Sequence, residues 1–280
     1  MLNVDFKNYY GAVKLTRPLN VTITFISVFI GAWVGGNISP HQKLLFACIS
    51  AGLICAGGNV LNDYYDIESD RINKPNRPVP SGIVKRSDAL LMWALTSIGG
   101  LVISFFVGLR GVFIALIAFV FLFLYNSFFK NSILFGNITI SFLTGLAFIY
   151  GGIAVGNING AFVPAIFAFL FHFGREIIKD AEDIEGDKLA GLNTFPIKFG
   201  VKKSIYFVAI IFLLLSIFTI YPYLFLGYSV LYLLVVFCVD FVILYVIYSL
   251  FKNHSKYNFI RLNKILKGDM IVGLLALYLR

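Results

Sequence analysis

The chain has 280 residues, of which 59% are hydrophobic and 13% are charged, and its net charge at pH 7 is +9. A soluble domain carries roughly 25% charged residues, so this composition excludes an ordinary soluble protein and indicates an integral membrane protein. The excess of Lys and Arg is expected at the membrane surface, and nucleic acid is not an expected partner.

Nine apolar segments follow one another along the chain, each near the length of about 20 residues that a membrane-spanning helix needs. They fall at 18–36, 43–63, 88–108, 111–129, 133–153, 161–180, 203–221, 224–250 and 265–279. The strands of a membrane β-barrel have about 10 residues of alternating polarity, whereas these segments are longer and continuously apolar. The sequence therefore predicts a single all-α polytopic membrane domain over residues 1–280, with nine transmembrane helices.

The Lys and Arg residues are distributed unevenly between the two ends of these helices. With the N-terminus inside, 20 of them, from Lys7 onward, fall on inner segments, and only Lys43, Arg110 and Arg280 fall outside. Cytoplasmic segments carry such an excess. We therefore expect a multi-pass protein of the cell membrane, with its N-terminus cytoplasmic and its C-terminus outside.

Three inner loops stand out by length or charge. The first two, at 64–87 and 181–202, are expected to be cytoplasmic and to cover a functional site. The third, at 252–267, is basic and precedes the ninth apolar segment. It is expected to anchor the chain at the membrane surface or to gather an anionic substrate.

A short acidic sequence occurs twice, as NDYYDIESD at 62–70 and as KDAEDIEGD at 179–187. At an offset of 117 residues, five of the nine positions are identical. Both copies follow apolar segments, the second and the sixth, that descend to the inner side. We therefore expect two similar four-helix halves, about 1–130 and 131–250, plus a ninth helix at 265–279, around a central cavity with the site between the halves.

In each copy, acidic and amide side chains share one face of a helix. At 100° per residue, the first face holds Asn62, Asp66 and Asp70, with Asn59 and Asn73 beside them, and the second holds Glu176, Asp180, Asp183 and Asp187. Pro75 limits how far the first helix continues. Glu68 and Glu185 point away from these faces.

Two facing acidic clusters repel each other unless cations lie between them. Carboxylate and amide oxygens suit Mg²⁺, which usually binds through a few carboxylates plus substrate phosphates. The inner loops also supply basic side chains for the remaining phosphate charge, namely Arg71, Lys74, Arg77, Lys130, Arg175 and Lys179. Salt-bridged loop ends are the alternative, and Lys179 and Asp183 have the i, i+4 spacing of such a pair.

An N-D-x-x-D-x-x-x-D motif at 62–70, with D-x-x-x-D at 183–187 on a chain of nine apolar segments, resembles the UbiA family of intramembrane prenyltransferases. The resemblance covers essentially the whole chain. It implies a Mg²⁺-dependent transferase with a cytoplasmic-side cavity open laterally to lipid. Within the family, 62–82 and 173–200 look most like the archaeal digeranylgeranylglyceryl phosphate synthases. That branch joins geranylgeranyl diphosphate to geranylgeranylglyceryl phosphate, which forms the second ether bond of archaeal membrane lipid.

The resemblance also implies roles for individual residues. Asn62, Asp66 and Asp70 would bind one Mg²⁺ and Asp183 and Asp187 a second, the two ions bridging the substrate diphosphate. Tyr125 and Lys130 in YNSFFK match a Tyr–Lys pair of the family, although their spacing of five is one more than in the common aromatic-acceptor pattern. The implied catalytic residues are Asp66, Asp70, Asp183 and Asp187, and the expected substrate-binding residues are Asn59, Asp63, Arg71, Asn73, Lys74, Arg77, Tyr125, Lys130, Lys179 and Asp180.

Other functions remain open at this stage. Within the family, the alternative acceptor is an aromatic compound of the quinone-precursor type. CDP-alcohol phosphotransferases also carry intramembrane Asp residues, but their D-G-x-x-A-R segment is absent from the sequence. A cation transporter would place its acids near the bilayer midplane. The expected partners are a prenyl diphosphate, a lipid-like phosphate acceptor and membrane lipids.

Overall fold

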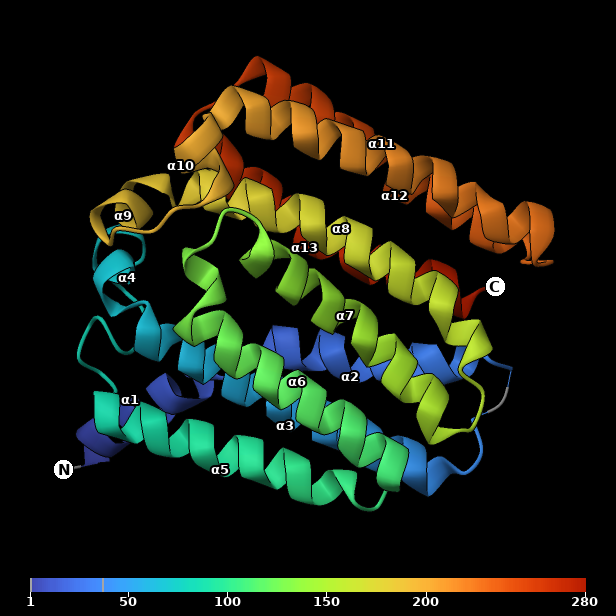
Figure 1. The fold of residues 1–280 in the computed structure, drawn as a ribbon, viewed down its shortest axis with the longest axis horizontal. Helices are drawn as coiled ribbons and strands as arrows, with labels where there is room; N and C mark the ends of the chain where they lie inside the picture. The colour runs from blue at the N-terminus through green and yellow to red at the C-terminus, as the bar shows by residue number, and fades with distance from the viewer. Residues whose placement is uncertain (1, 37) are drawn as a thin grey trace.

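The computed structural model describes residues 2–36 and 38–280, with side chains from Tyr9 onward, and Figure 1 shows that this part of the chain is a bundle of helices. The side chain of Lys7, counted above among the inner-side cations, lies outside the described residues. Within the described ranges there is no strand. The long helices are α2 (Pro18–Val34), α3 (His41–Tyr65), α5 (Arg86–Ser104), α6 (Leu109–Ser127), α7 (Phe135–Ala154), α8 (Phe162–Glu182), α11 (Val201–Phe225), α12 (Val230–Lys252) and α13 (Lys256–Tyr278).

Shorter helices lie at the end of the bundle that holds the N-terminus (Figure 1). They are α1 (Leu2–Leu15), α4 (Ile67–Asn73), α9 (Ile184–Leu189) and α10 (Phe195–Phe199), and 3-10 turns occur at Phe129–Asn131 and Asn159–Ala161. The predicted loops 64–87 and 181–202 therefore contain helical turns. The C-terminus lies at the opposite end of the bundle (Figure 1).

Seven helices in the described part of the chain are long and apolar enough to cross a membrane, or eight if the bent pair Tyr9–Leu15 and Pro18–Val34 is one span. The all-helical, multi-pass class is confirmed, whereas the predicted number of nine is not reached by this criterion. The difference lies in α13, which is as long as a span but carries Lys256, Arg261 and Lys264 in its first half. Most of the predicted basic loop at 252–267 is thus helix, because α13 already begins at Lys256.

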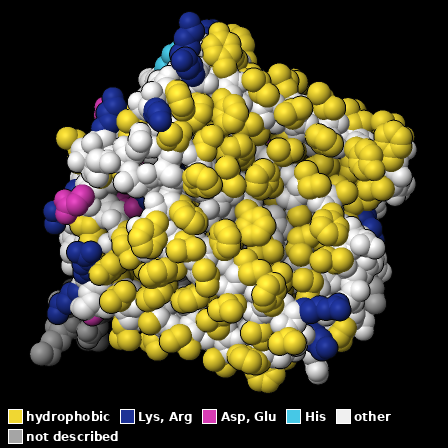
Figure 2. All heavy atoms as spheres, in the orientation of Figure 1, with side chains coloured by type: hydrophobic (Ala, Val, Ile, Leu, Met, Phe, Trp, Pro, Cys, Tyr) yellow, Lys and Arg dark blue, Asp and Glu magenta, His cyan; other side chains and the backbone are white. Residues whose placement is uncertain are grey.

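The lateral surface of the bundle is apolar, as a lipid-facing surface must be. Large side chains such as Leu109, Ile217 and Phe241 are 86%, 68% and 74% exposed. Figure 2 shows this apolar face, with Lys, Arg, Asp and Glu side chains gathered at the edge beside α4 and α9 and a smaller group of basic side chains at the other end.

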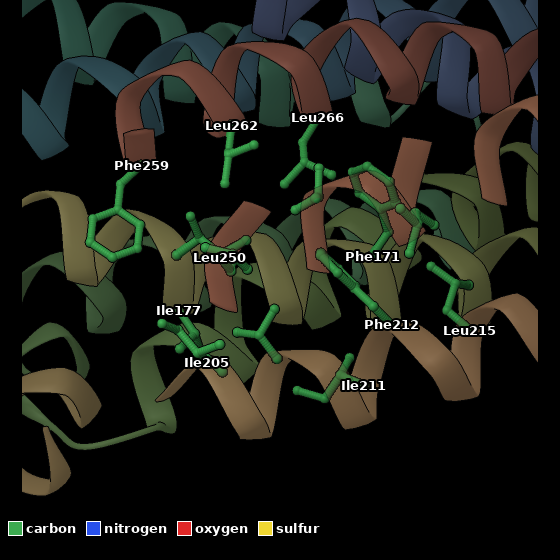
Figure 3. Close-up of a cluster of buried hydrophobic side chains, with 14 of the residues drawn as sticks. Phe171, Ile177, Ile205, Ile211, Phe212, Leu215, Leu250, Phe259, Leu262 and Leu266 are labelled. Atoms are coloured by element: carbon green, nitrogen blue, oxygen red, sulfur yellow. The ribbon is translucent and has the colours of Figure 1, made fainter. Parts of the chain in front are cut away.

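Close helix packing surrounds the centre of the bundle. A Cβ atom on Gly151 of α7 would lie 1.8 Å from the carbonyl oxygen of Val28 on α2, so only glycine permits this approach. On the other side, α8, α11, α12 and α13 enclose a buried apolar cluster that includes Phe212, Leu250 and Leu262 (Figure 3). These contacts fix α8 and α13, the helices that matter most for the site below.

Candidate active site

An internal cavity of about 530 Å³ lies between the long helices. Its apolar wall comes from α6, α7, α8 and α11, with Leu122, Leu146, Phe148, Phe167 and Leu215 among the contributing side chains. Where α3 and α8 end, it is lined by the polar side chains of Arg17, Asn62, Lys74, Arg77 and Lys179. An apolar cavity with convergent polar groups suits a ligand that has a hydrocarbon chain and a charged head.

The first acidic motif spans the break between α3 and α4, and its carboxylates pair with basic side chains. Asp63 forms ion pairs with Arg17 and Arg77. Arg77 also binds Asp70, at 2.5 Å between Nη1 and Oδ2. Asp63 and Asp70 are only 2% and 3% exposed, and a carboxylate buried to this degree requires such a partner. The helix interruption at Asp66 corrects the expectation that 62–70 is one continuous helix.

Lys130, in the turn after α6, forms an ion pair with Asp66. Burial is the largest single influence on the pKa of Asp66 and would raise it, but Lys130 together with Arg77 and Lys179 leaves this pKa below its ordinary value. Burial raises the pKa of Asp70 in spite of Arg77. Tyr125 is buried, lines the cavity and lies within electrostatic range of Lys130. The predicted Tyr–Lys pair thus lies beside the first motif.

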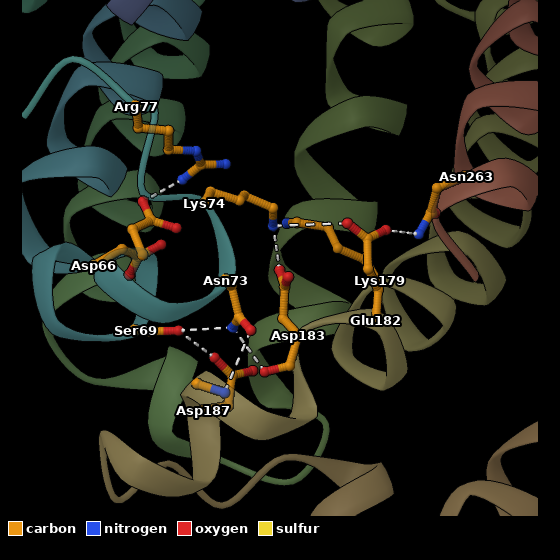
Figure 4. Close-up of polar contacts among 12 residues, drawn as sticks. Asp66, Ser69, Asn73, Lys74, Arg77, Lys179, Glu182, Asp183, Asp187 and Asn263 are labelled. Carbon is orange, nitrogen blue, oxygen red and sulfur yellow. Dashed lines mark hydrogen bonds and ion pairs between the residues drawn. The ribbon is translucent and has the colours of Figure 1, made fainter. Parts of the chain in front are cut away.

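The second acidic motif spans the break between α8 and α9 and contacts the first motif directly (Figure 4). Lys74, which follows α4, forms an ion pair with Asp183. The Ser69 hydroxyl donates to Asp187 Oδ1 at 2.7 Å. Burial raises the pKa of Asp187, although the Ser69 hydrogen bond opposes the shift. Two segments 117 residues apart in the sequence therefore meet at one end of the cavity.

Asn73 joins α4 to α9 through the backbone (Figure 4). Its Nδ2 donates to the Asp183 carbonyl oxygen at 2.8 Å, and its Oδ1 accepts from the Gly186 N–H at 3.3 Å. A Cβ on Gly186 would lie 2.3 Å from Asn73 Nδ2 and 2.7 Å from the Ser69 carbonyl oxygen. The two short helices therefore touch where the sequence has glycine.

The remaining predicted residues divide into two groups. Asn59 lines the cavity and donates to the Thr16 carbonyl oxygen at 2.9 Å, and Lys179 lines it and donates to Glu176 at 2.9 Å. Two others, Arg71 and Asp180, do not line the cavity, and their substrate-binding roles stay predictions. Arg71 is 62% exposed and pairs with Glu68, and Asp180 accepts a 2.7 Å hydrogen bond from Asn137 on α7.

Within the described residues no group of three or more His, Cys, Asp or Glu side chains converges as a metal site. The donor set nevertheless fits Mg²⁺, because it consists of carboxylate and amide oxygens. One of these atoms, Asp183 Oδ1, is buried and has no hydrogen-bond partner in the described part of the chain. Asn62 Oδ1, which accepts from Arg17 at 2.8 Å, is a further oxygen at the same end.

Sequence reasoning missed the part that Arg17 plays, and it did not place the basic residues of 252–267 at the cavity. Arg17 lies between α1 and α2 with φ of 52°, a left-handed conformation that is uncommon for Arg, and its guanidinium reaches Asp63. Asn263, Lys264 and Lys267 of α13 line the cavity. For α13 the signal is a basic run directly before an apolar segment, but the sequence does not predict which face of that helix turns toward the cavity.

Comparison with known proteins agrees with this geometry. Residues 24–262 match the UbiA prenyltransferase family. A digeranylgeranylglyceryl phosphate synthase of Methanocaldococcus jannaschii is 37% identical over 265 residues, which cover 94% of this chain and 93% of that protein. The protein of the same name from Thermococcus kodakarensis is 34% identical over 276 residues and 98% of this chain.

Solved structures share the fold. A structure reported for digeranylgeranylglyceryl phosphate synthase in membranes superposes with a TM-score of 0.76 at 36% identity and covers 97% of each chain. A UbiA homolog from Archaeoglobus fulgidus, bound to GPP and Mg²⁺, has a TM-score of 0.71 over 95% of this chain and 99% of its own; at 19% identity it supports the fold alone. The family predicted from the two acidic motifs is confirmed, and the chain belongs to the UbiA prenyltransferase family.

Proposed function

We propose that this protein transfers the geranylgeranyl group of geranylgeranyl diphosphate to the hydroxyl of geranylgeranylglyceryl phosphate, with Mg²⁺ as cofactor. The product carries the second ether bond of an archaeal membrane lipid. The observation that carries the proposal is the meeting of two acidic motifs with basic partners at one end of an apolar cavity. Relatives that bear the name of this activity, at 31–38% identity over 90% or more of the chain, support the choice of acceptor.

The proposal includes the topology. The ninth span is α13, the N-terminus and the two motif helices α4 and α9 are cytoplasmic, and the C-terminus is outside. The chain then consists of two four-helix halves, about 1–130 and 131–250, and a ninth helix. Supporting this arrangement, the N-terminus lies at the same end of the bundle as α4 and α9, and the C-terminus lies at the other (Figure 1).

Oxygen atoms of both motifs are the proposed metal ligands: Asn62, Asp66 and Asp70 on one side, and Asp183 and Asp187 on the other. These residues would hold two Mg²⁺ ions, which would neutralise the charge that develops on the leaving diphosphate. Lys74, Arg77 and Lys130 pair with these carboxylates in the structure, and with Mg²⁺ bound there they would be available to phosphate oxygens of the substrate.

The reaction breaks the allylic C–O bond of the prenyl diphosphate, and the electron pair leaves with the diphosphate. The acceptor hydroxyl oxygen forms the new C–O bond, and its proton passes to a diphosphate oxygen or to one of the acidic side chains. The basic side chains hold the leaving group in place and stabilise its charge. Leu122, Leu146 and Phe148 keep water away from the cationic carbon.

A transfer assay with the purified protein in detergent or lipid tests the proposal. The donor is geranylgeranyl diphosphate with Mg²⁺, and the acceptor is either geranylgeranylglyceryl phosphate or an aromatic acid. Removing a charge-stabilising group from an active site lowers kcat by about 10²–10³-fold, which we expect for Asp66→Asn and for Asp183→Asn. Glu68→Gln is the matched control, because Glu68 belongs to the first motif but its side chain is 73% exposed.

Two outcomes would contradict the proposal. Product with the aromatic acceptor alone would keep the transferase chemistry and reject the lipid acceptor. A lack of transfer to either acceptor would reject both, and cation transport would then be the function to test.

A further inference from the structure

A second group of basic side chains lines the cavity on the side of α8 and α13. It consists of Arg175, Lys264 and Lys267, which we call the α13 basic group. None of the three contacts α4 or α9 through a hydrogen bond or ion pair in the described part of the chain. The group is therefore distinct from the basic side chains that pair with the two acidic motifs.

Two members of the α13 basic group, Lys264 and Lys267, have no negatively charged partner in the described part of the chain. Among the described residues, Lys264 and Lys267 have no ion pair and no hydrogen bond, whereas Lys74, Arg77 and Lys130 each bind a motif carboxylate. The charges acting on Lys267 include those of Arg17 and Arg175, which have the same sign as its own.

Arg175 is only partly neutralised. Its Nη1 lies 3.3 Å from Glu176 Oε1, but the same carboxylate also accepts from Lys179 at 2.9 Å. The Nε of Arg175 and the Nδ1 of His172, one turn earlier on α8, are buried without a hydrogen-bond partner in the described part of the chain. Lys264 is exposed, but Lys267 is partly buried. Its uncompensated charge and the unpartnered buried atoms of Arg175 and His172 are unfavourable unless a ligand binds there.

Glu182 lies between Lys74 and Asn263 of α13, the residue next to Lys264 (Figure 4). Its Oε1 is 3.9 Å from Lys74 Nζ, on the side of the acidic motifs, and its Oε2 accepts from Asn263 of α13 at 2.6 Å. A carboxylate at this position separates two regions that would each hold an anion. Two phosphate-bearing molecules that bind together repel each other. The Glu182 carboxylate, with cations on both sides, therefore favours one phosphate on each side of it.

We propose that the α13 basic group binds the phosphate of the acceptor, the phosphomonoester of a glycerol lipid, while the motif cations bind the diphosphate of the donor. This inference rests on the proposed function and assigns the acceptor site that the function requires. A phosphomonoester carries a charge of about −1.5 to −2 at pH 7, which two or three basic side chains balance. The hydrocarbon chain of the acceptor then extends along the apolar wall of the same cavity.

The test compares KM values for the two substrates in nanodiscs of phosphatidylcholine. A hydrogen bond to a charged group contributes about 1.5–3 kcal/mol, so Lys267→Met is expected to raise KM for the acceptor by about 10- to 100-fold. In this variant, KM for geranylgeranyl diphosphate and kcat are expected to stay within about threefold of the wild-type values. Lys267→Arg keeps the charge and is expected to keep most of the acceptor affinity, which separates charge from folding defects. Lys203→Met, an exposed lysine at the start of α11, is the matched control.

A second arm uses geranylgeranylglycerol, the acceptor without its phosphate. The wild type and Lys267→Met should use this alcohol equally poorly, because the lysine has no phosphate to bind. An equal loss with both acceptors would overturn the inference, as would a rise in KM for the diphosphate substrate alone. Competition by phosphatidylglycerol that disappears in Lys267→Met would assign the group to membrane headgroups and also overturn it. Wild-type ether synthesis with an unchanged acceptor KM in Lys267→Met would refute this inference alone, whereas the absence of ether synthesis by the wild type would refute the proposed function with it.

Discussion

Asp66 and Asp183 interrupt their helices with nearly the same backbone angles, φ −86°, ψ 8° and φ −92°, ψ 3°. In each case the N–H of the Asp donates to the carbonyl oxygen four residues earlier, and its own carbonyl oxygen accepts from the Asp four residues later. A long helix thus ends, and a short helix begins, at the same position of both motifs. The repeat in the sequence corresponds to a repeated local structure, which brings the short helices α4 and α9 into contact.

Lys130 is expected to stabilise the leaving diphosphate, because it is the cation nearest to Asp66 in the first motif. Replacing it by Met should lower kcat/KM for geranylgeranyl diphosphate by about 10²–10³-fold, the usual effect of removing a group that stabilises developing charge. Steady-state kinetics with saturating acceptor measure this, with Lys130→Arg as the charge-retaining variant. An activity within threefold of the wild type would show that Lys130 only neutralises Asp66.

Gly186 is expected to be required for the contact between α4 and α9. In Gly186→Ala the new methyl group would meet the Ser69 carbonyl oxygen at 2.7 Å, which is backbone and cannot rotate away. Overpacking of this kind costs about 1–3 kcal/mol, so the thermal midpoint and the Mg²⁺-dependent activity should both fall.

Gly268→Ala provides the control for Gly186→Ala. Gly268 lies in α13, and nothing lies within 4 Å of a Cβ added there. Because Ala is a better helix former than Gly by up to about 1 kcal/mol, this variant should be neutral or more stable. Equal behaviour of the two variants would argue against close packing at Gly186.

The order of the helices and the two motifs were predictable from the sequence, because apolar length and Asp spacing are local signals. The partners of the charges were not. Arg71 and Arg77 are equally basic in the sequence, yet Arg71 projects into solvent and Arg77 binds Asp63 and Asp70. The direction of each depends on how the chain turns after α4, a tertiary property.

The same limit applies to Asp180, which matches Asp63 in the repeat. Asp63 binds two arginines, whereas Asp180 binds Asn137 on α7. The motif fixes the position of each Asp along its helix, but the neighbouring helix determines what the side chain meets. A repeat in sequence therefore predicts equivalent backbone positions better than equivalent contacts.

Metal and diphosphate should bind together. In the structure Lys74 and Lys130 occupy the carboxylates of Asp183 and Asp66, so a metal alone must displace these cations, whereas added diphosphate gives them a new partner. Inorganic pyrophosphate with Mg²⁺ is expected to raise the thermal midpoint. At a ligand concentration a hundredfold above Kd, the free energy of unfolding rises by about 2.7 kcal/mol. Either component alone should have a much smaller effect.

The variant Asp183→Asn is expected to lose most of this stabilisation, and Glu68→Gln to keep it. EDTA should abolish both the shift and prenyl transfer while the helix content measured by circular dichroism stays constant. Full stabilisation by pyrophosphate in the presence of EDTA would contradict a metal-dependent site.

Two carboxyl groups inside the bundle, Asp240 on α12 and Asp269 on α13, give a prediction about stability that is independent of the acidic motifs. Asp269 is 4% exposed, and neither of its oxygens has a hydrogen-bond partner in the described part of the chain. Asp240 is 8% exposed, and its Oδ2 accepts from the Thr219 hydroxyl at 2.8 Å. One site therefore has an unsatisfied polar group, and the other is partly satisfied.

Replacing Asp269 and replacing Thr219, the donor to Asp240, should shift stability in opposite directions. Leaving a buried polar group without a partner costs about 1–3 kcal/mol, so Asp269→Leu is expected to raise the thermal midpoint in detergent. Thr219→Val removes the hydroxyl that donates to Asp240 Oδ2 at 2.8 Å and should lower the midpoint by a similar free energy. Glu185→Gln, at an exposed position paired with Lys256, should leave the midpoint unchanged. If Asp269→Leu instead destabilised the protein, Asp269 would have a partner in the membrane-embedded protein, and a water molecule or the bound acceptor would be the group to test next.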